Sequence, residues 1–154
     1  MFSMRHIILT MMMLTIFSVA CIVPAIAAVP SSTVIDLEVL DPEDMIGSGK
    51  AAPNYGSVTQ GERDTYTHYV DVTDTLFELS LEWDKNTGNI LQLIVYPPSG
   101  TPIYLKDEDD GSTNGKIAAR TSLPGNTVGA TWKVIVEGVQ ITGSQSYTLI
   151  VNST

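Results

Sequence analysis

Cysteine, histidine and basic side chains are scarce in this sequence. Its 154 residues include one cysteine, two histidines, and eight Lys and Arg against 17 Asp and Glu, which gives a formal net charge of −9. A single cysteine allows no internal disulfide. The excess of acid argues against a nucleic-acid or anionic-membrane partner, because phosphate binding needs Lys and Arg clustered on one face. The length suits one domain, and an apolar content of 44% is too high for a disordered chain.

Residues 1–28 have the layout of a secretory signal peptide. Arg5 precedes an uncharged stretch, residues 7–28, which ends with the small-x-small sequence Ala25-Ile26-Ala27. Cleavage after Ala27 predicts a secreted or cell-surface chain without cysteine and with one histidine, a composition that excludes a zinc centre. Two alternatives stay open: an uncleaved leader that anchors the chain in a membrane, and a lipid modification at Cys21.

Beyond the leader, apolar and polar residues alternate with the two-residue period of β-strands. The period predicts that Phe77, Leu79, Leu81 and Trp83 share a buried face, with the intervening glutamates in water. Residues 132–137 and 147–151 alternate in the same way, and residues 90–96 are apolar on both faces, as in a central strand. Weaker strands are expected at residues 34–40, 65–72, 101–105 and 116–121.

Short strands separated by turns, without helical periodicity, predict an all-β chain. Glycine, proline and asparagine occur between the strands, as in Pro97-Pro98-Ser99-Gly100 and Pro124-Gly125-Asn126, and these residues favour chain reversal. We expect an antiparallel, jelly-roll-like β-sandwich of about 8–9 strands. The expected organisation is a signal peptide (1–28), an N-terminal strand and loop (29–53), and the sandwich (54–154).

Several of these segments resemble the bacterial and archaeal pre-peptidase C-terminal (PPC) domain family. Residues 56–72 combine a glycine turn, a short strand, an acidic turn and a strand of alternating aromatics, and residues 91–100 form a strand that ends in Pro-Ser-Gly. Residues 75–83, 132–137 and 146–151 resemble the family's other long strands, so that the likeness covers residues 55–154. The resemblance implies a jelly-roll-like sandwich that binds or spaces without catalysis, sometimes with calcium. The sequence departs from the family at Asn89, Ile90 and Gln92, where aspartates are common. A second expected departure is that the sandwich follows the leader without a preceding protease domain.

One acidic segment is a candidate calcium site. Residues 107–115 place four acids, a serine, a threonine and an asparagine around two glycines, and calcium takes 6–8 oxygen ligands. We expect Asp107, Asp109, Asp110 and Asn114 to supply them. The spacing is not that of an EF-hand, since Ala118 stands where the last glutamate is required. The alternative is a solvated acidic hairpin tip.

Catalysis is not expected. His68 lies near Asp64 and Asp71, but no serine occurs in a nucleophile-elbow motif. In the alternating strand His68 shares a face with Tyr66 and Val70, which predicts a half-buried, hydrogen-bonded histidine instead. A glycan-stacking platform is a further hypothesis, because tyrosine combines an apolar ring with a polar hydroxyl. Its candidate residues are Tyr55, Tyr66, Tyr69, Tyr96 and Tyr104.

Together these features predict a non-catalytic, extracellular binding or adhesion module whose partner is an extracellular protein or glycan. The alternative is a structural surface subunit that assembles with copies of itself. In that case the strand at residues 33–40, tethered by a loop rich in proline and glycine, would complete a neighbour's open sheet edge. The simpler expectation is that this strand pairs with its own sheet.

Overall fold

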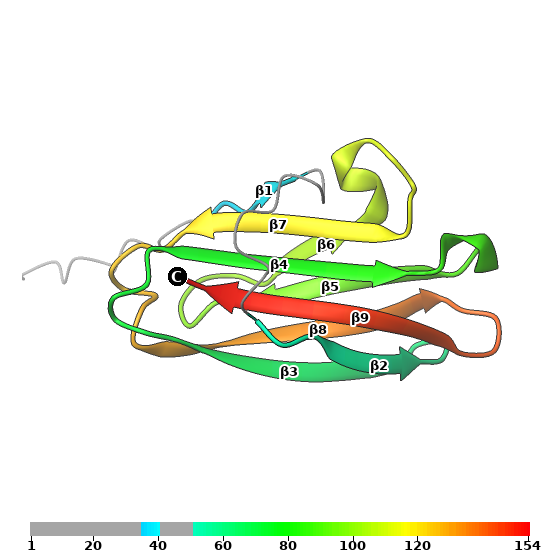
Figure 1. Ribbon diagram of the computed structural model, residues 1–154, viewed down its shortest axis with the longest axis horizontal. Coiled ribbons are helices and arrows are strands. Elements are labelled where there is room, and N and C mark those ends of the chain that lie inside the picture. Colours follow the sequence, from blue (N-terminus) through cyan, green and yellow to red (C-terminus); the bar gives the residue numbers. More distant parts are fainter. Residues whose placement is uncertain (1–34, 41–50) are drawn as a thin grey trace, which may run out of the picture. The chain divides into compact units, whose positions relative to one another are not determined.

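The computed structural model describes residues 35–40 and 51–154, which form an all-β structure (Figure 1). The expected leader and the rest of the N-terminal segment lie outside the described residues. Within the described ranges no helix is long and apolar enough to cross a membrane. The strands are β1 (Glu38–Val39), β2 (Asn54–Val58), β3 (Arg63–Val70), β4 (Leu76–Trp83), β5 (Ile90–Tyr96), β6 (Ile103–Lys106), β7 (Lys116–Ser122), β8 (Ala130–Gln140) and β9 (Gln145–Ser153), with short 3₁₀ turns at η2 (Lys85–Thr87) and η3 (Asp107–Asp110).

The strands form two antiparallel sheets, as expected for a β-sandwich. The five-stranded sheet has the order β1-β7-β4-β9-β2, and the four-stranded sheet has the order β3-β8-β5-β6. Figure 1 shows the first sheet in front of the second. The pairing is nested, because β2 pairs with β9, β3 with β8, β4 with β7 and β5 with β6. The outermost pair, β2 with β9, therefore joins segments that are far apart in the sequence, whereas the innermost pair, β5 with β6, joins neighbouring ones.

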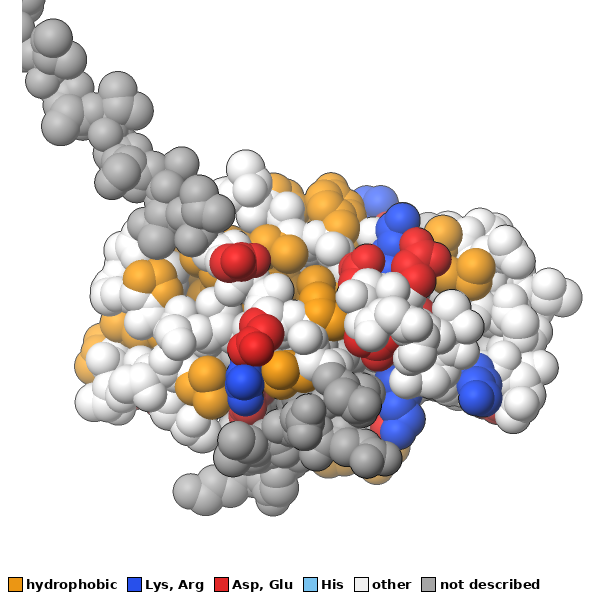
Figure 2. Space-filling view, turned by 90° about the horizontal axis from the view of Figure 1, so that it is seen from above, with side chains coloured by type: hydrophobic (Ala, Val, Ile, Leu, Met, Phe, Trp, Pro, Cys, Tyr) orange, Lys and Arg blue, Asp and Glu red, His pale blue; other side chains and the backbone are white. Residues whose placement is uncertain are grey.

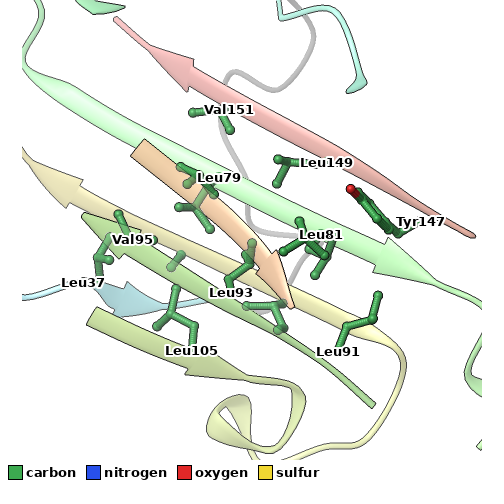
Figure 3. Packing of buried hydrophobic residues seen from close by; sticks show 14 of the residues in the cluster. Leu37, Leu79, Leu81, Leu91, Leu93, Val95, Leu105, Tyr147, Leu149 and Val151 are labelled. Atoms are coloured by element: carbon green, nitrogen blue, oxygen red, sulfur yellow. The ribbon is translucent and has the colours of Figure 1, made fainter. Parts of the chain in front are cut away.

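The core lies between the sheets and follows the predicted alternation. Phe77, Leu79, Leu81 and Trp83 are all buried. The Phe77 ring of β4 stacks on the Trp132 ring of β8, with a distance of 4.4 Å between centroids and 22° between planes. Figure 3 shows leucine and valine side chains from both sheets pointing into the same layer. Burial of these side chains removes apolar surface from water, which is the main stabilising contribution to such a fold.

One part of the alternation prediction is wrong. Glu78 was expected in water, but only 1% of its surface is exposed. It points away from the core, and its neighbours across the strands are Arg120 and Asn152. Asn152 and Ala118 on the same outer face are buried as well. Alternation predicts the face to which a side chain points, but it does not predict whether that face is open to solvent.

The segment at residues 35–40 lies along the edge of the five-stranded sheet. Glu38 and Val39 pair with β7, and the backbone N–H of Leu40 donates to the Ala118 carbonyl at 2.9 Å. Leu37 is buried and belongs to the core cluster (Figure 3). Pairing of this strand with its own sheet is thus confirmed within the described residues, although the regular strand is shorter than expected.

Candidate functional site

Exposed tyrosine side chains and basic side chains point outward together from the four-stranded sheet. Because Leu91, Leu93 and Val95 of β5 point into the core, the residues between them point outward, and the strand pairing extends this assignment to β3, β8 and β6. We call this surface the tyrosine face. Its outward residues are Arg63, Thr65, Thr67, Tyr69, Gln92, Ile94, Tyr96, Tyr104, Lys106, Thr131, Lys133, Ile135 and Glu137.

The centre of the tyrosine face is apolar but shielded. Ile94 and Ile135 are paired across β5 and β8, and their exposed fractions are only 1% and 7%. Tyr104 of β6 stands opposite Ile94, and Thr65 of β3 stands opposite Ile135. The accessible part of this face therefore consists of tyrosine rings, hydroxyls and charged groups around a buried aliphatic pair.

Charged groups on the tyrosine face are held in defined places. Arg63 donates from Nε and Nη2 to Glu137 Oε1 at 2.9 and 2.7 Å, and this hydrogen bond and charge raise the pKa of the Arg63 guanidinium. The ammonium of Lys133 lies 4.0 Å from the centroid of the Tyr96 ring, a cation–π arrangement. The tyrosine face thus carries three outward basic side chains, those of Arg63, Lys106 and Lys133, and one outward carboxylate, that of Glu137.

The predicted tyrosine platform is present only in part. Tyr69 and Tyr104 are 60% and 56% exposed on the tyrosine face, together with the partly covered Tyr96. Tyr55 is 77% exposed, but it pairs with Thr148 on the outer side of the five-stranded sheet. Tyr66 was predicted wrongly, because its ring points inward and packs against the core. Only the pairing of the strands decides which tyrosines share a face.

Tyr66 instead takes part in a contact between the two sheets. Its hydroxyl lies 2.7 Å from that of Tyr147, which donates to Asp64 Oδ2 at 2.5 Å. Burial raises the pKa of Tyr147, and the hydrogen bond to Asp64 raises it further by a smaller amount. These groups lie against Gly56, where an added Cβ would fall 2.2 Å from the Tyr147 hydroxyl. The contact connects β9 of one sheet to β3 of the other.

His68 is half-buried and hydrogen-bonded, as expected, but its partners are residues that the sequence did not indicate. Its Nε2 lies 2.9 Å from Ser153 Oγ, and Ser153 Oγ donates to Asp74 Oδ2 at 2.6 Å. Asp64 and Asp71 bind other groups, Tyr147 and Thr73. Because the single proton of the Ser153 hydroxyl goes to Asp74, His68 Nε2 must donate to Ser153. A protonated Nε2 does not activate Ser153 as a nucleophile.

The expected calcium ligands lie in one loop, where they accept hydrogen bonds from the backbone. Asp107 Oδ1 accepts from the N–H groups of Asn114, Gly115 and Lys116 at 3.1–3.2 Å. Asp109 Oδ2 accepts from the Lys106 N–H at 2.7 Å, and Asp110 Oδ1 accepts from the Ser112 N–H at 2.8 Å. Asn114 Oδ1 is buried without a hydrogen-bond partner. In the part of the chain that the structure describes, no three His, Cys, Asp or Glu side chains converge on a common point.

A pocket of about 410 Å³ adjoins the tyrosine face at the η3 end of the sandwich. It is lined by the exposed Ile90 and Val139, by Gln92 and Lys106 of the tyrosine face, and by Lys85 of η2. Such a mixture of apolar walls and a few polar groups is usual in binding pockets. The pocket extends from Lys106 toward Lys85, and Asp107 and Glu108 of η3 line it as well.

Fold and surface together define the chain as an antiparallel β-sandwich with an open, tyrosine-bearing sheet face. No protein-family model matches the chain, and no curated protein is significantly similar to it.

Proposed function

We propose that this chain is a secreted or cell-surface, non-catalytic binding or adhesion module of the PPC-like type. Its partner is an extracellular glycan or protein, which it meets through the tyrosine face. The observation that carries the proposal is the exposure of Tyr69 and Tyr104 on the same sheet face that bears Arg63 and Lys133. Exposed tyrosine and arginine side chains are enriched at recognition surfaces, because they combine large contact area with hydrogen bonding.

The order of the strands supports the PPC-like type. With β1 set aside, the sheets have the orders β7-β4-β9-β2 and β3-β8-β5-β6. Four nested antiparallel pairs divided between two sheets are the arrangement that we expect of an eight-stranded jelly roll. In this arrangement the loops between the described strands lie at the two ends of the sandwich, and one sheet face stays available for a partner.

A glycan and matrix-protein binding array tests this proposal with two tyrosine variants. Tyr104→Ala removes an exposed ring from the tyrosine face, and Tyr55→Ala removes one of similar exposure from the other sheet. We expect the chain to bind at least one ligand of the array, Tyr104→Ala to weaken that binding, and Tyr55→Ala to leave it unchanged. Equal binding by all three proteins, or binding lost only in Tyr55→Ala, would place the contact elsewhere.

We also propose that calcium stiffens the 107–115 loop. The support is chemical: carboxylates at Asp107, Asp109 and Asp110 and the buried, unpartnered Asn114 Oδ1 belong to one loop, and calcium prefers such oxygens. Calorimetry with and without calcium, on the chain and on an Asp109→Asn, Asp110→Asn variant, tests this role. We expect calcium to raise the melting temperature of the chain only. An equal response of both proteins would contradict the proposal that calcium binds in this loop.

Self-assembly through residues 33–40 is the second candidate function. The observation in its favour is that β1 has only two paired residues, yet it inserts Leu37 into the core at a sheet edge. A neighbouring copy offers the same edge, so exchange of this strand would recreate the same contacts. Size-exclusion chromatography over a range of concentrations, with and without residues 29–40, tests this. Monomers at every concentration would contradict it.

A further inference from the structure

We propose that the ligand of the tyrosine face is an acidic polysaccharide, a chain of sugars that bear carboxylates. This inference rests on the proposed function and adds the chemical class of the partner. Its starting point is the uneven distribution of charge over the described residues, and its second step is the nature of the exposed groups on the tyrosine face.

The tyrosine face is basic on an acidic protein. The sequence has a net charge of −9, yet three of the six described Lys and Arg side chains, Arg63, Lys106 and Lys133, point outward from the four-stranded sheet. Figure 2 views the sandwich from above, and it shows acidic side chains gathered where η3 lies. Repulsion from the rest of the surface and attraction by this face direct an anionic ligand to the tyrosine face.

Some of these cations are not neutralised by a carboxylate. Lys133 lies over Tyr96, and among the described residues it forms no ion pair. The same holds for Lys85 at the adjoining pocket, within the ranges that the structure describes. Lys106 approaches Glu108 only at 3.6 Å, and its side chain is 55% exposed. Asp107 and Glu108 also line that pocket, so the free positive charge of the tyrosine face lies chiefly at Lys133, and Lys106 is on the same face.

The exposed groups favour a sugar chain over a protein. Protein interfaces are built around an apolar core, but the aliphatic pair at the centre of the tyrosine face, Ile94 and Ile135, is already buried. What remains accessible is tyrosine rings with polar neighbours such as Thr65 and Gln92. A sugar ring has an apolar C–H side, which stacks on tyrosine, and hydroxyls that bond to such neighbours. Its carboxylates would pair with the lysines.

Binding to polygalacturonate, and to the same polymer after methyl esterification of its carboxylates, tests the inference. We expect the purified chain to bind the acidic polymer, with binding weakened by salt, and to bind the esterified polymer at least tenfold more weakly. Lys106→Gln with Lys133→Gln should weaken binding by about two- to fivefold for each lost charge. Lys116→Gln removes one charge from the other sheet, and it should have no effect.

The outcomes separate this inference from the proposed function. Equal binding of acidic and esterified polymer, reduced by Tyr104→Ala, would overturn the anionic ligand and keep the tyrosine face as the binding surface. Binding to the acidic polymer that no tyrosine-face variant reduces would overturn both. No binding to the acidic polymer overturns the inference alone, since the array tests the tyrosine face with other ligands. Sedimentation that shows dimers lost in Tyr104→Ala would replace the polysaccharide with a second copy of the chain.

Discussion

At the scale of single residues, Gly56 is the position where the smallest change has the largest expected effect. A Cβ at this position would lie 2.2 Å from the Tyr147 hydroxyl and 2.8 Å from that of Tyr66. Gly56→Ala must therefore displace Tyr147, which donates to Asp64 across the two sheets, and Tyr66, whose hydroxyl is bonded to that of Tyr147. We expect a loss of about 1–3 kcal/mol in the free energy of unfolding, measured by urea denaturation. Gly125→Ala is the control, because no atom lies within 4 Å of its Cβ; equal effects would contradict the steric argument.

His68 gives the chain a pH dependence whose sign follows from its burial. Burial lowers the pKa of His68 below its ordinary value of 6.5, and the negative charge of Asp74 opposes this shift. The unfolded chain therefore takes up the proton at a higher pH than the folded chain does. The stability that this group contributes is complete above pH 6.5 and is lost as the pH falls toward the lower pKa of the folded state.

Thermal unfolding at about pH 7.5 and pH 5.5 measures this loss. We expect the melting temperature to fall more for the chain than for His68→Gln over this interval. The lowered pKa values of Glu62 and Asp71 act below their ordinary values of 4.5 and 3.8, outside the interval. Parallel changes in the two proteins would mean that His68 does not contribute.

At the scale of elements, β1 is held by its side chains more than by its backbone. Only Glu38 and Val39 pair with β7, whereas Leu37 is buried in the core cluster. We expect Leu37→Ala to cost about 2 kcal/mol, and the exposed Asp36→Ala to change stability by less than about 0.5 kcal/mol. Urea denaturation measures both. If Leu37→Ala has no effect, the strand does not contribute to the fold in solution.

The strands also show what the sequence could predict. Alternation identified the cores of β4, β8 and β9, because a buried face requires an apolar residue at every second position. The nearly continuous apolar run of residues 90–96 identified β5. Alternation did not predict the full length of β8, which continues to Gln140 past a bulge opposite Ile90 and Leu91. Backbone pairing maintains a strand there without an apolar pattern.

The candidate site was less predictable than the strands. The tyrosines were recognised as candidates, but Tyr66 and Tyr55 were separated from the others by strand pairing that sequence spacing does not contain. Ser153 lies 85 positions from His68, and only the proximity of β9 to β3 across the two sheets brings the two side chains together. The acids of the 107–115 loop were recognised, but their use as acceptors for backbone N–H groups depends on the path of the loop.

At the scale of the whole molecule, the apolar core stabilises the fold and the acidic surface destabilises it. The sandwich is held by apolar contacts such as the stacking of Phe77 on Trp132, which salt does not weaken. Its surface carries an excess of acid, including four consecutive acids in η3, and mutual repulsion among these groups destabilises the compact state. The four described ion pairs are at least partly exposed, so each contributes little.

Salt should therefore stabilise the fold while it weakens the proposed binding. Raising sodium chloride from about 10 to 300 mM shortens the screening length from roughly 30 Å to less than 10 Å, which reduces the repulsion among acids more than it weakens the few ion pairs. We expect the melting temperature to rise by roughly 3–8 °C. Over the same range, retention on polygalacturonate should decline, because it depends on attraction to Lys106 and Lys133. A melting temperature that falls with salt would show instead that the ion pairs outweigh the repulsion.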